Sequence, residues 1–205
     1  MTDESLKEEI LINVTTSEVR AALLENGVLQ EVYIERAARR GLISNIYKGR
    51  VLRVLPGMQA AFIDIGLERT AFLHASDIAP NPEQLSSDAL PSIRDLVREG
   101  DEIMVQVAKD PLGNKGARLT TFITLPSRHL VLLPHSDTVG ISARIEDEDE
   151  RERLRVIVEE ILAERNLSCG AIVRTVAEGM GKEALLADLN YTLKLWAVIQ
   201  EHCSK

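Results

Sequence analysis

The stretch AAFIDIGLERTAFLH, residues 60–74, holds two of the three phenylalanines of the chain. Its apolar and polar residues alternate, which predicts two short strands, because successive side chains of a strand point to opposite faces. Ile63 and Leu73 then lie on the apolar face, whereas Phe62 and Phe72 lie on the opposite face with polar neighbours. This is an unusual place for a core phenylalanine, so both rings are candidates for contacts with a ligand.

The bulk composition is typical of a soluble globular protein. The chain has 205 residues, of which 45% are hydrophobic and 27% charged, which allows one or two domains with a real core. We expect no transmembrane helix, because no run of about 18 apolar residues occurs. The acidic start, MTDESLKEEI, does not resemble a signal peptide. Cys169 and Cys203 fit no metal-ligand spacing, and we expect reduced thiols in a cytoplasmic protein.

Charge is unevenly distributed along the chain. The net charge is −8, which argues mildly against a general polyanion binder. Six basic residues and no acidic residue lie between Arg36 and Arg53, whereas nine acidic residues lie between Glu146 and Glu164. The basic stripe is either a local docking site for nucleic acid or a solvated face. Charge alone favours the solvated face.

The alternation of residues predicts several strands before and after the opening stretch. Residues 10–14 read as one strand, and residues 19–24 and 28–34 read as a hairpin around Glu25-Asn26-Gly27. Five short strands follow between about residues 46 and 124. They are interrupted by a polar, proline-rich connection over residues 78–93 and a short helix over residues 93–99. Five strands with a long middle connection predict a small closed barrel of the OB type.

The pattern after residue 127 predicts a smaller α/β unit. Strands are expected at residues 129–134, 140–145 and 170–175. A helix is expected at residues 148–165, because apolar residues recur along one side of it, and a second helix at residues 182–199 for the same reason.

An OB-type barrel binds single-stranded nucleic acid on one face, through stacked aromatic rings and a positive groove. Phe62 and Phe72, on neighbouring strands, are each placed to take one base. Lys115 follows a Leu-Gly-Asn turn and is placed to meet a phosphate. The alternative is that both rings cap the barrel beneath a neighbouring loop, and the residues alone do not decide between these two interpretations.

Several long motifs resemble the ribonuclease E/G family. They are NIYKGRVLRVLPGMQAAFIDIG, AFLHASDI, KDPLGNKGARLTTFITLPSR, GISARIE and IVRTVAEG. The resemblance covers residues 9 to about 200, and the sequences of these motifs are closer to the ribonuclease G members than to the ribonuclease E members. It implies an α+β fold in three parts. Residues 1–43 are the start of an incomplete ribonuclease-H-like fold, residues 44–124 an OB-fold RNA-binding barrel, and residues 125–205 a 5′-sensor domain with the start of the return to the ribonuclease-H-like fold.

The resemblance also implies an activity for the full-length protein. Members of the family are Mg-dependent endoribonucleases that cut single-stranded RNA, prefer a 5′-monophosphate end, and act in 5′ maturation of small-subunit ribosomal RNA and in mRNA decay. Their catalytic aspartates, and a Cys-x-x-Cys zinc site that joins subunits into dimers or larger assemblies, come later in the family sequence. We therefore expect no cofactor, no catalytic residue and no membrane partner for this chain, which we expect to bind RNA without cutting it.

Individual site residues are implied by the same resemblance. Phe62, Phe72 and Lys115 match the RNA-contacting positions of the family barrel. Arg174 and Thr175 match the pocket for the 5′-phosphate, with the main chain of Val131 nearby.

The residue types of this pocket suit a phosphate, because a guanidinium holds two phosphate oxygens and a hydroxyl donates a further hydrogen bond. From the residues alone, the favoured interpretation of Arg174 is a strand-end arginine paired with an acid such as Glu178. Ribonuclease E has two adjacent arginines where this chain has Ala143-Arg144, so Arg144 is the remaining candidate for that phosphate contact.

A different class of protein accounts for part of the pattern. A stand-alone, non-enzymatic RNA-binding or ribosome-associated protein explains the barrel equally well. It does not explain the N-terminal hairpin or the sensor-like IVRT segment of residues 172–175.

Overall fold

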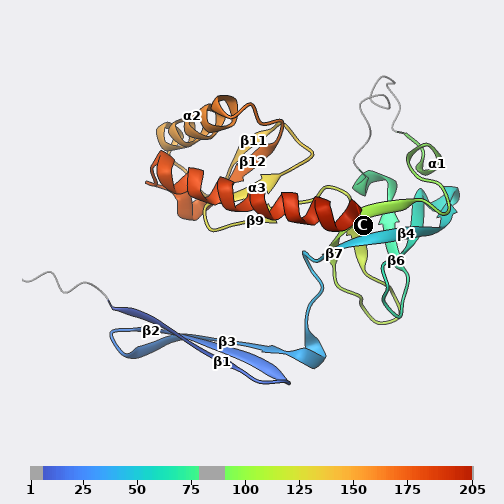
Figure 1. The fold of residues 1–205 in the computed structure, drawn as a ribbon, viewed down its shortest axis with the longest axis horizontal. Helices are drawn as coiled ribbons and strands as arrows, with labels where there is room; N and C mark the ends of the chain where they lie inside the picture. Colours follow the sequence, from blue (N-terminus) through green and yellow to red (C-terminus); the bar gives the residue numbers. More distant parts are fainter. Residues whose placement is uncertain (1–6, 79–90, 205) are drawn as a thin grey trace, which may run out of the picture. The chain divides into compact units, whose positions relative to one another are not determined.

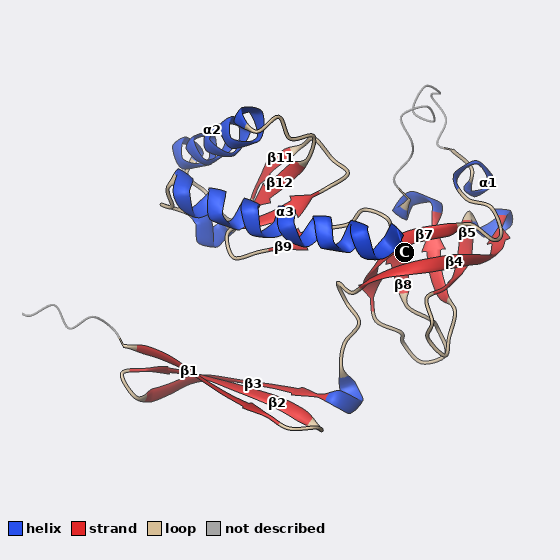
Figure 2. Ribbon diagram, viewed as in Figure 1, coloured by secondary structure: helices blue, strands red, loops and turns tan. Residues whose placement is uncertain are grey.

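The computed structural model describes residues 7–78 and 91–204, which form two compact units, Met1–Leu42 and Ile43–Lys205 (Figure 1). The first unit is a single antiparallel sheet. The second contains a closed barrel followed by an α/β layer (Figure 2). Most of the proline-rich connection predicted between residues 78 and 93 lies outside the described residues.

The first unit has three strands in the order β1-β2-β3, and these are β1 (Glu8–Val14), β2 (Glu18–Glu25) and β3 (Val28–Arg36). The predicted hairpin is confirmed. Asn26 and Gly27 form its two-residue turn with φ values of 49° and 78°. This is the geometry of a type I′ turn, which favours Asn-Gly because both central residues have positive φ. A short 3-10 helix, Ala37–Arg39, follows β3.

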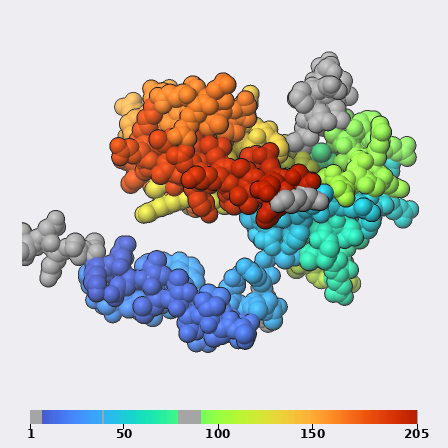
Figure 3. All heavy atoms as spheres, in the orientation of Figure 1, coloured from blue at the N-terminus to red at the C-terminus, as the bar shows by residue number. Residues whose placement is uncertain are grey.

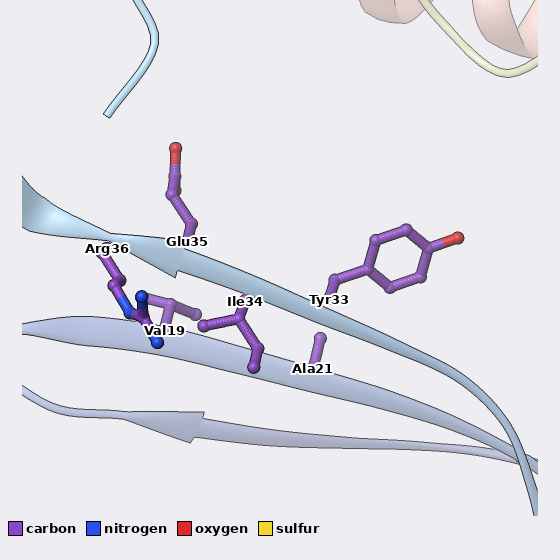
Figure 4. Close-up of a pocket in the computed structure, with 6 residues that line it drawn as sticks. All are labelled: Val19, Ala21, Tyr33, Ile34, Glu35 and Arg36. Atoms are coloured by element: carbon purple, nitrogen blue, oxygen red, sulfur yellow. The ribbon is translucent and has the colours of Figure 1, made fainter. Parts of the chain in front are cut away.

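The sheet of the first unit leaves large apolar side chains exposed on both faces. Ile10, Leu11 and Ile12 are consecutive, so they point alternately to the two faces, and each is more than half exposed. Figure 3 shows this unit in blue. Tyr33 and Ile34 of β3 line a shallow hollow along β2 and β3 (Figure 4). Large apolar side chains exposed on both faces of one sheet are uncommon in a soluble monomeric protein.

The second unit begins with the predicted five-stranded barrel. Its strands close in the order β4-β5-β6-β8-β7, and they are β4 (Ile46–Leu55), β5 (Ala60–Asp64), β6 (Ala71–His74), β7 (Glu102–Lys109) and β8 (Arg118–Thr120). The interior is filled by side chains that are at most 1% exposed, including Val51, Ile63, Leu73, Val105 and Leu119. The predicted apolar face of the opening stretch is therefore the barrel interior.

Short elements connect the strands of the barrel. A 3-10 helix follows β4 (Pro56–Met58), another follows β6 (Ala75–Asp77), and α1 (Ile93–Leu96) precedes β7. Ser92 and Asp95 form a reciprocal capping box at the start of α1. This helix is shorter than predicted, because the backbone is already extended at Val97 and the carboxylate of Asp101 accepts a hydrogen bond from the Arg98 N–H.

The α/β layer contains a four-stranded sheet in the order β11-β12-β10-β9. Its elements are β9 (Leu125–Pro126), β10 (Leu130–Leu133), β11 (Val139–Ile141), α2 (Glu148–Glu164), β12 (Gly170–Val173), the 3-10 helix Thr175–Ala177 and α3 (Lys182–Ser204). The sequence did not predict β9. The strand predicted over residues 140–145 ends at Ile141, because Ile145 turns back to donate to the Ser142 carbonyl at 3.1 Å.

Both long helices contribute to the core that covers one face of this sheet. Leu130 and Leu132 of β10 and Val173 of β12 are buried in one cluster with apolar residues of α2 and α3. Val131 and Ile172 are cross-strand neighbours on the other face, where Ile172 is exposed. The helices therefore leave one face of the sheet open, next to the end of β12.

Candidate nucleic-acid interface

Phe62 and Phe72 meet on the outer face of the barrel. They are direct cross-strand partners on β5 and β6, which places both side chains on the same side of the sheet. Their ring centroids are 6.3 Å apart and the ring planes meet at 67°, an edge-to-face arrangement. The sequence prediction that both rings lie on the face opposite Ile63 and Leu73 is confirmed.

The two rings are partly exposed and line one open groove. Both have intermediate solvent exposure, so neither is sealed beneath a loop. The groove has a volume of about 1100 Å³, and its lining includes Met58, Phe62, Phe72 and Lys115. A groove with exposed ring surface can accept the flat face of a nucleobase.

A tight turn carries Lys115 to the rim of this groove. Leu112 and Lys115 exchange backbone hydrogen bonds of 3.2 and 3.0 Å, which closes a two-residue turn through Gly113, whose φ is 56°. The guanidinium of Arg69 donates to the Gly113 carbonyl and ties the turn to the segment before β6. The structure therefore brings Lys115 and the two rings to one groove.

Gly116 allows this turn to lie close to β6. A Cβ atom at this position would lie 1.9 Å from the Thr70 carbonyl oxygen, which no side chain tolerates. The absence of a side chain at residue 116 thus allows the turn to pack against the backbone of Thr70 and Ala71.

Further charged residues of the groove were not singled out from the sequence. Lys109, Arg118 and Arg69 line it together with Lys115, against one acidic residue, Glu68. The guanidinium of Arg118 pairs with the Asp77 carboxylate at 2.8 and 2.9 Å. The groove is therefore basic although the chain as a whole is acidic, which suits a polyanion with exposed bases.

His74 extends the aromatic surface by one ring. It stacks on Phe72 with centroids 6.5 Å apart and planes at 30°. Its Nδ1 accepts a hydrogen bond from the Ser76 N–H at 3.1 Å, which fixes the ring orientation. The alternation of residues in β6 put His74 on the Phe72 face, but gave no reason to expect stacking.

Arg174 lies at a second candidate site, at the end of β12. Its guanidinium donates to the carbonyl oxygens of Ser127 and Arg128 at 2.6 and 3.3 Å. Its side chain therefore lies against the turn before β10, and no hydrogen bond or ion pair joins it to the described Glu178, so the simple pairing considered from the sequence is not what the structure shows. Both bonds use one terminal nitrogen, which leaves the other guanidinium N–H groups for an anion.

Thr175 meets a residue that the sequence analysis did not name. Its hydroxyl is 3.0 Å from the Ser142 hydroxyl, which follows β11. The guanidinium of Arg151 donates to the carbonyls of Ser142 and Ile145 at 2.8 and 3.1 Å and so holds this turn in place. Two hydroxyl groups thus come together one residue after Arg174.

The other two predicted phosphate residues are placed less closely. Arg144 is exposed, and its backbone N–H donates to the Ser142 hydroxyl at 3.4 Å. Val131 lies on β10, on the open face of the sheet. The structure brings Arg144 and Thr175 to the same Ser142 turn by these contacts, but it shows no contact of the Arg144 side chain with Arg174.

Asp188 on α3 organises the turn that holds Arg174. Its carboxylate accepts hydrogen bonds from the Ser127 hydroxyl at 2.9 Å and from the His129 N–H at 2.5 Å. Burial alone would raise the pKa of Asp188, but these donors outweigh it and leave the pKa below its usual value. A carboxylate that stays ionised keeps the carbonyls of residues 127 and 128 directed at the guanidinium.

Comparisons with known proteins agree with this geometry. Residues 43–121 match the S1 RNA binding domain, and residues 124–205 match the ribonuclease E/G family. The chain therefore combines an S1 domain, which is an OB-type barrel, with a ribonuclease E/G family domain.

The chain is similar to particular members of this family. It is 55% identical to ribonuclease G of Escherichia coli (strain K12) over 94% of its length, and 54% identical to ribonuclease G of Haemophilus influenzae over 96%. It is 42% identical to ribonuclease E of Escherichia coli (strain K12) over 95% of its length. The chain spans 40% of the length of the two ribonuclease G proteins and 18% of that of ribonuclease E.

Among the described residues, no group of three or more His, Cys, Asp or Glu side chains is arranged to hold a metal ion. No helix in the described part of the chain is long and apolar enough to span a membrane. Burial raises the pKa of the Cys169 thiol, so this cysteine is not activated as a nucleophile.

Proposed function

We propose that this chain is the RNA-binding and 5′-end-sensing portion of an endoribonuclease like ribonuclease G. The observation that carries the proposal is the pair of partly exposed rings, Phe62 and Phe72, in a basic groove of an S1 domain. Two successive bases of single-stranded RNA stack on these rings, and Lys115 contacts a phosphate. Stacking is tolerant of sequence because every base has a flat π face.

The proposed 5′-monophosphate site is built around Arg174 and Thr175, with the main chain of Val131 and the side chain of Arg144 at its edges. The free guanidinium N–H groups and the hydroxyl pair of Thr175 and Ser142 supply donors for a compact dianion. A 5′-hydroxyl end offers no such charge. The proposal therefore includes a preference for RNA that carries a 5′-monophosphate.

This preference is measurable on matched RNAs. One single-stranded oligonucleotide is prepared with a 5′-monophosphate and with a 5′-hydroxyl, and its affinity is measured for the chain and for Arg174→Ala. We expect tighter binding of the monophosphate form, and we expect Arg174→Ala to abolish the difference while leaving 5′-hydroxyl binding unchanged. Equal binding of both forms by the original chain would reduce the proposal to a plain RNA-binding protein.

The activity and targets of the longer relatives are part of the same proposal. We propose that RNA cleavage, with Mg²⁺ as cofactor, and assembly of subunits through zinc depend on chain outside these 205 residues. Ribosomal RNA precursors and mRNA of the cytoplasm are the proposed substrates. The chain incubated with 5′-monophosphorylated RNA and Mg²⁺ is expected to leave the RNA intact, and specific cleavage that survives repurification would contradict this.

We further propose that β1, β2 and β3 are one part of a ribonuclease-H-like sheet. The support is the exposure of Ile10, Leu11 and Ile12 on both faces, since such side chains are normally covered. Hydrogen exchange compares the amides of β2 in this chain and in a ribonuclease-G-like protein of full length. We expect slower exchange in the longer protein, and equal rates would contradict the proposal.

A further inference from the structure

Most basic residues of the stripe over residues 36–53 have an acidic partner. Four of its six basic residues form ion pairs, namely Arg36 with Glu18, Arg40 with Glu35, and both Lys48 and Arg50 with Glu102. Arg53, by contrast, is exposed and makes no hydrogen bond or ion pair with its side chain among the described residues. Its side chain is therefore available to an external anion.

A β-bulge determines the direction of the Arg53 side chain. On β4, Val51 is paired with Ile63 of β5, and the next pair is Arg53 with Phe62. Two residues of β4, Leu52 and Arg53, thus oppose the single residue Phe62. This is the definition of a bulge, which shifts the alternation of side chains by one position.

Without this bulge, Arg53 would point into the barrel. Gly49 and Val51 face the interior, and both are buried. Regular alternation would put residue 53 on the same side, where an arginine cannot be accommodated. The extra residue, Leu52, turns Arg53 outward and places it beside Phe62. Bulges next to functional sites commonly serve to redirect a side chain in this way.

The strand register then gives one continuous row across four strands. Arg53 on β4 is paired with Phe62 on β5, Phe62 with Phe72 on β6, and Phe72 with Arg118 on β8. In the antiparallel pairs β4–β5 and β5–β6, directly paired residues share a face and have Cβ atoms about 4.5–5.5 Å apart. Strands β6 and β8 are parallel, and Arg118 lines the same groove as the two rings. In this register, Phe62 and Phe72 therefore lie between Arg53 on one side and Arg118 on the other.

The two arginines differ in whether an acidic side chain pairs with them. Arg118 is held by Asp77, at 2.8 Å, so part of its charge is already neutralised. Among the described residues, Arg53 has no such acidic partner, and the carboxylate of Glu99 accepts its hydrogen bond from the neighbouring Val54 N–H at 3.1 Å. Of these two arginines, Arg53 is therefore the one whose charge is not paired with an acid among the described residues.

We propose that Arg53 is a further RNA contact, which binds the phosphate next to the base that stacks on Phe62. The RNA then crosses the strands of the barrel, from β4 over β5 and β6 toward β8, instead of running along them. This inference rests on the proposed function, because it assumes that Phe62 stacks a base.

The test compares two substitutions that remove the same charge from the same strand. Arg53→Gln and Arg50→Gln each remove one positive charge from β4, but Arg50 is paired with Glu102 and lies opposite Asp64. Each full chain is titrated with a labelled single-stranded RNA carrying a 5′-hydroxyl, so that the 5′-end site does not contribute, over a series of salt concentrations. Arg53→Lys and the original chain complete the set.

We expect Arg53→Gln to weaken binding about tenfold at low salt, as for the loss of a hydrogen bond to a charged group. Its salt slope should become shallower by about 0.7, the value for one phosphate of a single strand. Arg53→Lys should keep the original slope, and Arg50→Gln should bind like the original chain. Unchanged affinity and slope for Arg53→Gln, or an equal loss for Arg50→Gln, would overturn the inference.

Phe62→Ala, measured in the same series, separates this inference from the proposed function. Weaker binding by Phe62→Ala with unchanged binding by Arg53→Gln would refute only the role of Arg53. Unchanged binding by both variants would refute stacking on the barrel as well. Thermal unfolding of every variant serves as the control for an intact barrel. Because Arg53 is exposed, its replacement is not expected to disturb folding.

Discussion

The barrel and the N-terminal sheet are built from similar strands but differ in what they bury. Both contain short antiparallel strands that are rich in Ile, Val and Leu. Closure of the barrel leaves Ile63 and Leu73 fully buried, whereas Ile10 and Ile12 of the open sheet are each 67% exposed. The comparison shows that apolar strands make a core only when the sheet closes or is covered. Because the core lies inside the closed barrel, the outer face does not have to be covered and can carry a ligand site.

The largest expected effect is on stability, when one large apolar side chain is replaced by alanine in each of the two regions. Leu73→Ala should destabilise the second unit by about 2–5 kcal/mol, because it opens a cavity in the barrel. Ile12→Ala, at an exposed position, should change stability by less than about 0.5 kcal/mol. Urea unfolding followed by circular dichroism and by the fluorescence of Trp196, which lies on α3, measures both. A cost for Ile12→Ala close to that for Leu73→Ala would show that the sheet is covered.

The next effect concerns aromatic rings of the two regions. Phe62→Ala and Phe72→Ala should each weaken binding of single-stranded RNA by about 1–3 kcal/mol, the range for loss of one stacked base. Tyr33→Ala removes a ring that is 60% exposed on the N-terminal sheet, and it should leave binding unchanged. Titration with a fluorescent oligonucleotide measures all three. Equal losses for Tyr33→Ala and Phe62→Ala would contradict a site confined to the barrel.

A smaller effect is expected from a charge pair of the α/β layer. The Arg153 guanidinium pairs with Glu150 through two hydrogen bonds, and together with the Gly179 N–H it lowers the pKa of Glu150 to about 2. A carboxyl group whose pKa is lower in the folded state than in the unfolded state stabilises the folded protein at pH values above the unfolded-state pKa. This stabilisation is lost as the pH falls from the unfolded-state value of 4.5 toward 2.

Glu150→Gln should therefore lower the stability of the second unit at pH 7 by about 1 kcal/mol or less, because the pair is near the surface. The difference between the two chains should shrink as the pH is lowered toward 2. Thermal unfolding at several pH values measures it. A difference that grows at low pH would contradict the assigned direction of the pKa shift.

The smallest effect is expected at an ion pair of the N-terminal sheet. The guanidinium of Arg20 hydrogen-bonds Glu18 and lowers its pKa, with a further contribution from Arg36. Both arginines are largely exposed, so water and salt screen the attraction. Glu18→Gln should give the same unfolding curve as the original chain. A clear loss of stability would show that this sheet is more buried than its exposed side chains indicate.

Much of the fold could be predicted because its strands alternate regularly. The alternation in residues 60–74 was enough to separate Ile63 and Leu73 from Phe62 and Phe72, and the Asn26-Gly27 dipeptide was enough to place the hairpin. Boundaries were less predictable where a local hydrogen bond ends an element. The strand predicted to reach residue 145 stops at Ile141 because the Ser142 turn competes with it.

The candidate sites were predicted only in part, since contacts between distant segments leave no local pattern. The Arg174 guanidinium finds the carbonyls of residues 127 and 128, and Thr175 finds Ser142, across gaps of more than 30 residues. The sequence did contain a pattern that could have predicted the outward direction of Arg53. It occupies a position that regular alternation from Gly49 and Val51 would bury, and an arginine in the sequence at such a position is a reason to suspect a bulge.

The central claim is that the ring pair of the barrel receives RNA bases, and it is tested most directly on the rings themselves. The chain has three phenylalanines, so selective labelling of this residue type gives three sets of NMR ring signals, with Phe122 as the internal reference. On titration with a short single-stranded RNA bearing a 5′-hydroxyl, we expect the ring signals of Phe62 and Phe72 to shift strongly together. Saturable RNA binding that leaves both sets of signals unmoved would contradict the account.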